Sequence, residues 1–151
     1  PLAGAAPPFV HRAVVAHATY SPEVRHPVEV TADQESHLVA WLSKRLGPPL
    51  RAPHLESVGY NLVGGRLLPG EPGSPVAQFM YQCKMGTRVT LYMRANAPAN
   101  RETAFLYSTE GPVKVFYWID RKLGYAVSSA DIDKEALLKV AQAAYQQHNP
   151  E

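Results

Sequence analysis

The chain has 151 residues, a length that suits a single domain, and its 46% hydrophobic content can supply an apolar core. Its 15 lysines and arginines against 13 acidic residues leave a net charge of only +2. This small and dispersed charge argues against a nucleic-acid-binding surface. No stretch approaches the roughly 20 apolar residues needed to cross a bilayer.

Residues 1–8 read PLAGAAPP, a run of small residues and prolines. Such a composition favours extended conformations and resists packing. The run is too short, and too uncharged at its start, to be a signal peptide. We therefore expect residues 1–8 to be a linker, followed by one folded domain over residues 9–148.

Apolar spacing predicts two helices before the strand-rich part of the chain. The first covers residues 9–20, and Pro22 ends it. The second begins at Thr31, which forms a predicted capping box with Gln34, and ends at Leu46 before Gly47. The apolar stripe of the first contains Phe9, Val10, Ala13, Val14, Ala16 and His17, and that of the second contains Leu38, Trp41, Leu42 and Leu46.

A third helix is predicted near the end of the chain, with Asp131 as its N-cap. Asp133 and Glu135 fall in its first turn. One face should cover a sheet. That face carries Leu137, Val140, Ala141, Ala144 and Tyr145.

Between the helices, alternating and β-branched residues predict strands. The best hairpin joins residues 76–83 to residues 88–94 through a turn with Gly86, and one of its faces should be buried. The other predicted strands are residues 28–30, 103–108, 113–119 and 124–128. Residues 58–67 are predicted to form two strands, or one strand broken at a Gly64–Gly65 turn. Residues 69–75 and 95–101 are predicted loops. Strands with short links, flanked by helices, predict an α+β domain: a mostly antiparallel sheet of about five to seven strands with N-terminal helices and a C-terminal helix packed on it.

Motifs that carry chemistry are scarce. There is no nucleophile elbow, phosphate-binding loop or dinucleotide fingerprint. The six histidines, His11, His17, His26, His37, His54 and His148, form no His-x-x-x-His pair, so the sequence predicts no metal site. Cys83 is interpreted as a core thiol, with a reactive surface thiol as the alternative. The carboxylate pairs Asp131 with Asp133 and Glu23 with Glu29 suit capping or surface roles. We therefore expect no catalytic, cofactor-binding or metal-binding residues.

Two aromatic features leave a binding role open. Phe116 and Trp118 alternate with Tyr117 along a strand, which indicates either core packing or an apolar-ligand groove. His37 and Trp41, four residues apart, could stack on one helix face, although plain helix surface is the simpler interpretation.

Several ordered segments carry a family resemblance: HPVEV (residues 26–30), HLVAWLSKRLG (37–47), VGYNLVGGRLLPG (58–70), VAQFMYQ (76–82) and VFYWIDRKLGYAVSS (115–129). Together they resemble the extracytoplasmic regions of proteobacterial transmembrane anti-sigma factors. In that family a cytoplasmic domain holds an extracytoplasmic-function sigma factor, one helix spans the inner membrane, and the outer domain receives or transmits a stress signal. Regulated proteolysis commonly releases the sigma factor.

The resemblance implies a non-catalytic periplasmic regulatory domain whose linker comes from a membrane span. Its implied partners are the sigma factor, bound through a separate cytoplasmic domain, and a periplasmic protease or signalling protein. The alternative from another class is a periplasmic carrier or sensor of an apolar, lipid-like ligand; a hydrolase ranks third. Exposed sheet edges also allow a homodimer.

Overall fold

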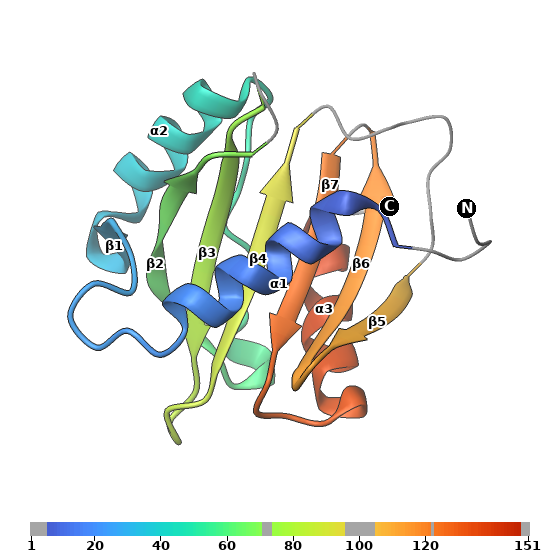
Figure 1. Cartoon of the computed structure of the whole chain (residues 1–151). Coiled ribbons are helices and arrows are strands. Elements are labelled where there is room, and N and C mark those ends of the chain that lie inside the picture. Colours follow the sequence, from blue (N-terminus) through green and yellow to red (C-terminus); the bar gives the residue numbers. More distant parts are fainter. Residues whose placement is uncertain (1–5, 71–73, 96–104, 122, 149–151) are drawn as a thin grey trace.

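In the computed structural model, which describes residues 6–70, 74–95, 105–121 and 123–148, seven strands form one sheet in the order β1-β2-β3-β4-β7-β6-β5 (Figure 1). Every pair of neighbours is antiparallel. The strands are β1 (Val30–Thr31), β2 (Asn61–Leu68), β3 (Val76–Gln82), β4 (Arg88–Arg94), β5 (Leu106–Glu110), β6 (Val113–Asp120) and β7 (Leu123–Ser129). The helices are α1 (Pro8–Tyr20), α2 (Glu35–Leu46) and α3 (Lys134–His148). The α+β prediction, with an antiparallel sheet and helices from both parts of the chain, is confirmed.

Some expectations fall partly outside the described residues. These are the linker over residues 1–8, the loops over residues 69–75 and 95–101, and the start of the strand predicted from residue 103. Of that strand, β5 is described from Leu106.

The sheet is covered on both faces. Helix α1 lies across one face, where it contacts β4, β6 and β7, while α2 and α3 pack on the other (Figure 1). All six residues of the predicted α1 stripe are buried. Phe9 has no exposed surface; its ring rests on Gly124 of β7 and meets the Tyr117 ring edge-on at 6.4 Å.

The start of α2 differs from the predicted capping box. Residues Ala32–Gln34 form a 3-10 turn, and α2 begins at Glu35. The Thr31 hydroxyl donates a hydrogen bond to the Asp33 carboxylate, and Thr31 makes no capping hydrogen bond with its side chain. The 3-10 turn moves the start of α2 to Glu35, which places Gln34 and not Thr31 at the N-cap position of that helix. The apolar stripe itself is confirmed for Leu38, Leu42 and Leu46, with Trp41 half-buried.

Helix α3 begins two residues later than the predicted N-cap implies. The Asp133 carboxylate accepts a 2.8 Å hydrogen bond from the Ala136 amide, so Asp133 and not Asp131 caps the helix. The predicted inner face is buried at Leu137, Val140, Ala141 and Ala144. Tyr145 is 37% exposed, and its ring meets that of Trp118 at 5.8 Å.

The glycine pair Gly64–Gly65 lies inside β2, so the predicted turn is wrong. A bulge between Leu62 and Gly64 lets the strand continue. A Cβ on Gly64 would stand 2.1 Å from the Val30 carbonyl oxygen, and Gly64 has φ +152°. The pair therefore allows the close approach of β1 and is not a chain reversal.

The β3–β4 hairpin is confirmed in register, but both of its faces are buried. Val89, Leu91 and Met93 face α2 and α3, while Thr90 and Tyr92 lie under α1. The expectation of a single buried face is therefore wrong, because α1 covers the side that carries the polar residues.

Candidate functional site

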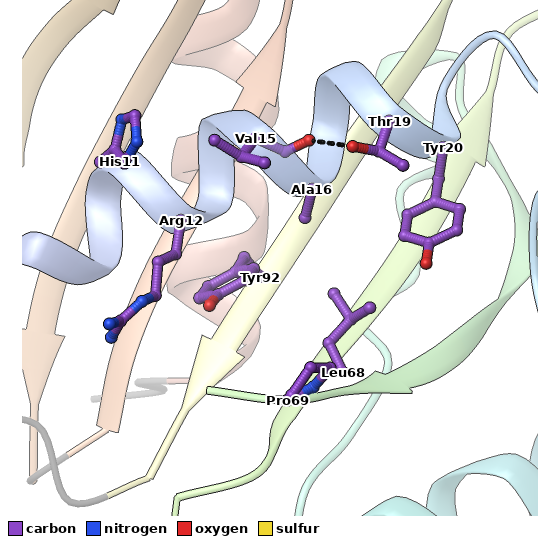
Figure 2. Close-up of a pocket in the computed structure, with 9 residues that line it drawn as sticks. All are labelled: His11, Arg12, Val15, Ala16, Thr19, Tyr20, Leu68, Pro69 and Tyr92. Carbon is purple, nitrogen blue, oxygen red and sulfur yellow. Dashed lines mark hydrogen bonds between the residues drawn. The ribbon is translucent and has the colours of Figure 1, made fainter. Parts of the chain in front are cut away.

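Helix α1 leaves a groove beside it, on the face of the sheet that it covers. The groove has a volume of about 410 Å³ and runs between α1, the end of β2 and the middle of β4. Figure 2 shows the side chains of Arg12, Tyr92, Leu68 and Tyr20 gathered around this space. Its lining residues are His11, Arg12, Val15, Ala16, Thr19, Tyr20, Leu68, Pro69 and Tyr92.

The groove exists because α1 runs obliquely across the sheet (Figure 1). The N-terminal part of α1 packs tightly on β6 and β7 through Phe9, Ala13 and Val14. Towards Tyr20 the small side chains of Ala16 and Thr19 face the end of β2, where Leu68 and Pro69 form the opposite wall. The walls are therefore mostly apolar, and Tyr92 of β4 lies between them.

A buried polar contact anchors α1 next to the groove. His17 is 1% exposed, and its Nδ1 lies 2.8 Å from the Thr90 hydroxyl of β4. Burial lowers the pKa of His17 from 6.5 to about 4, because the charged imidazolium loses hydration, and the charge of Asp131 opposes only part of that effect. The neutral imidazole is thus part of the α1 interface at neutral pH.

A second polar side chain lies under the same helix. Gln78 of β3 is 1% exposed and pairs in register with Tyr92 on one side and Arg66 on the other. Within the part of the chain that the structure describes, the Gln78 Nε2 has no hydrogen-bond partner. An unsatisfied buried donor is costly, so Gln78 lowers the stability of this part of the sheet.

One arginine lines the groove, and a second stacks on a tyrosine that lines it. Arg12 projects from α1, and the Arg66 guanidinium stacks on the Tyr20 ring with its carbon 3.7 Å from the ring centroid. Arg66 also donates a 2.8 Å hydrogen bond to the His26 carbonyl oxygen. His11 is paired at 2.7 Å with Glu110 of β5, so that carboxylate is already engaged.

The aromatic strand that suggested a ligand groove is part of the core. Phe116, Tyr117 and Trp118 are at most 4% exposed. Trp118 stacks on Tyr125 with ring centroids 5.0 Å apart. Tyr117 faces α1, while its two neighbours face α3, as the alternation predicts. The core-packing interpretation is confirmed.

Cys83 is not in the core of a strand. It follows β3 in the turn of the hairpin and is partly exposed. Burial raises the pKa of its thiol, but hydrogen bonds with the turn backbone outweigh burial and lower it below the usual value. Tyr60 lies beside it, and burial together with the thiol raises the pKa of that phenol.

His37 and His54 lie in different surroundings. His37 is exposed on α2. His54 is paired at 3.0 Å with Glu35, whose hydrogen bond raises the pKa of this histidine, and its backbone is held by the Gln147 side chain. Among the described residues, no three histidine, cysteine or acidic side chains are grouped to hold a metal ion.

The groove was not found from the sequence. Tyr92 falls on the polar side of β4, and the alternation of that strand gives no sign that a helix covers this side. One signal was present: the stripe along residues 9–20, with five apolar residues and His17, requires a partner surface.

The chain matches no known protein-family model, and no curated protein matches it either. Among the described residues, no helix combines the length and apolar character needed to span a membrane.

Proposed function

We propose that this chain is the non-catalytic, periplasmic regulatory domain of a membrane-anchored anti-sigma factor. The sequence segments over residues 26–129 support this family, as set out above. In this proposal residues 1–8 tether the domain to an inner-membrane span, and a separate cytoplasmic domain holds the extracytoplasmic-function sigma factor.

One structural observation carries the mechanism. Helix α1 follows the proposed tether directly and is built into the core through Phe9, Ala13 and His17. A change in how α1 packs on β4, β6 and β7 therefore moves the chain next to the tether. We propose that a signal acts on this packing and changes the access of a periplasmic protease or signalling protein to the tether.

The first test concerns topology. Membrane and soluble fractions are immunoblotted with an antibody against this domain, and protease is added to spheroplasts. A band larger than 16.6 kDa, bound to the membrane and digested from outside, is expected. A soluble band of the size of this chain would refute the proposed anchoring.

The second test concerns regulation. In the full-length protein, Ala13→Arg should force α1 off the sheet, because Ala13 has no exposed surface. Ala18→Arg is the matched control, since Ala18 is exposed on the same helix and does not line the groove. A sigma-dependent reporter should change with the first variant and with deletion of the whole domain, but not with the control. An unchanged reporter in the deletion strain would reject the mechanism.

The alternative proposal is a periplasmic carrier or sensor of an apolar ligand. The aromatic strand no longer supports it, but the groove beside α1 does. A groove open to solvent suits sensing better than carriage, because a carrier has to enclose the apolar part of its cargo. Native mass spectrometry tests it: a lipid that stays bound to the purified protein is expected, and repeated ligand-free spectra would argue against it.

A further inference from the structure

His17 is an ionisable side chain buried between α1 and the sheet. Its Nδ1 atom lies 2.8 Å from the Thr90 hydroxyl of β4. Ser128 of β7 pairs in register with Thr90 on the same face, and its buried hydroxyl has no hydrogen-bond partner within the described part of the chain. The groups beneath this part of α1 are therefore neutral hydroxyls, which cannot offset the charge of an imidazolium removed from water.

The charges around α1 leave His17 neutral at neutral pH. Asp131, which follows β7, is the acidic group that favours the protonated form, but burial has the larger effect on the pKa of His17 and acts in the opposite direction. Strand β7, which is described in full, carries no ionisable side chain on the covered face. The other titratable or charged side chains on α1 and on the covered face are His11, Arg12 and Tyr20 of α1, Arg66 of β2, Arg88, Tyr92 and Arg94 of β4, Glu110 of β5 and Tyr117 of β6.

The two faces of the sheet have separate cores. The core of the covered face joins Phe9 and Val14 of α1 to the strands, while α2 and α3 cover the other face with Leu38 and Leu137. The contacts of α1 with the sheet can therefore be lost while the strands stay paired and the larger core stays buried.

Arg88 fixes the point at which a loosened α1 would pivot. Its guanidinium donates hydrogen bonds to the carbonyl oxygens of Ser21, at 2.8 Å, and Glu23, at 2.5 Å, just after α1 ends. The same side chain is held by Gln82 of β3 through its Nε atom. The chain after α1 is thus attached to the hairpin, and loosening α1 moves the opposite end of the helix, where the chain continues to residues 1–8.

We propose that α1 is an acid-sensitive latch: protonation of His17 releases the helix from β4 and β7 while the opposite face of the sheet stays folded. The open state exposes the apolar face that carries Val115 and Tyr117, so it is a minority state that acid makes more frequent. In the full-length protein, acid would then be the signal that changes access to the tether. That role rests on the proposed regulatory function; the opening itself does not.

Opening is measured through the reactivity of a buried thiol. Ala13→Cys places a thiol probe on the buried face of α1, in a Cys83→Ser background because Cys83 is partly exposed. The reagent is 4,4′-dithiodipyridine, which also reacts in acid, and each labelling rate is divided by the rate for the same protein unfolded in urea at that pH. Because the pKa of His17 is about 4 in the closed helix and 6.5 once the helix is open, this ratio should rise about thirtyfold from pH 7.5 to pH 5.0.

A second thiol probe separates local opening from global unfolding. Ala141→Cys, in the same background, lies on the buried face of α3. At pH 5.0 its labelling ratio should be at least about tenfold below that of Ala13→Cys. Hydrogen exchange of the unmodified chain repeats the comparison without a new thiol, and the amides of α1 should be at least about tenfold less protected than those of α3.

Two histidine variants assign the effect to His17. His17→Gln keeps a hydrogen-bonding side chain that does not titrate, so the labelling ratio of Ala13→Cys should change by less than about threefold between the two pH values. His37→Gln, on the exposed surface of α2, should keep the full rise. Circular dichroism melts establish that each variant folds.

Equal labelling ratios for the two thiol probes, or an undiminished rise in His17→Gln, would overturn the latch. The reporter strain, grown at pH 7.5 and at pH 5.0, tests its role as a signal. If thiol labelling behaves as described but the sigma-dependent reporter responds to acid equally in the wild-type and His17→Gln strains, the latch stands and acid is not the regulatory signal. If labelling shows no opening, the latch fails, while Ala13→Arg still tests the proposed function.

Discussion

Acid should destabilise this protein through His17. The buried imidazole has a pKa of about 4 in the folded state against 6.5 in the unfolded chain. Because the folded-state pKa is the lower one, the unfolded chain binds more protons between these values, and stability falls as the pH falls from 6.5 towards 4. The shift corresponds to about 3.4 kcal/mol when fully expressed, of which about 2.5 kcal/mol is reached at pH 4.5.

The test compares urea unfolding at pH 7.5 and pH 4.5 for the wild type and for His17→Gln. Glutamine can keep a hydrogen bond to the Thr90 hydroxyl but does not titrate. The acid-induced loss of unfolding free energy should be about 2.5 kcal/mol smaller in the variant. Contributions from carboxylates, and from the exposed His54–Glu35 pair, are common to both proteins and cancel in this comparison.

His37→Gln is the matched control, since His37 is exposed on α2. It should lose as much stability in acid as the wild type does. If His17→Gln and the wild type lose equal stability between the two pH values, the argument that a neutral, buried His17 anchors α1 is refuted.

Three further changes test the packing. Phe9→Ala should lower the unfolding free energy by about 3 to 5 kcal/mol, because the ring is fully buried on Gly124; a loss below about 1 kcal/mol would mean that α1 is not packed as described. Gly64→Ala should lower the unfolding free energy by more than about 2 kcal/mol, because the new methyl group collides with Val30. It should also abolish the hydrogen-exchange protection of the Glu29 amide, which bonds the Gly65 carbonyl oxygen, and retained protection would contradict this. Asp133→Ala should cost about 1 kcal/mol in thermal or urea unfolding while Asp131→Ala costs less, and the reverse order would restore Asp131 as the cap of α3.

The candidate site shows where sequence reasoning stops. Arg12, Tyr92 and Leu68 come from three elements that are far apart in the chain, and none of them belongs to a recognisable motif. Even His17, which the apolar stripe of residues 9–20 placed on the buried side, could not be matched with Thr90, 73 residues away. No local pattern encodes such a pairing, because it depends on where the helix crosses the sheet.

Local patterns in the sequence were enough to determine the helices, the β3–β4 hairpin and the α+β class. Helical stripes and strand alternation report directly which side of an element is apolar, and tight turns pair neighbouring strands in register. Tertiary structure alone decided the contact of β4 with β7, the burial of both faces of the hairpin, and the place of Gly64 inside a strand. These features arise from long-range packing: α1 folds back over a sheet whose central pairing joins strands that are not consecutive in the chain, and the groove forms where that helix and β2 diverge.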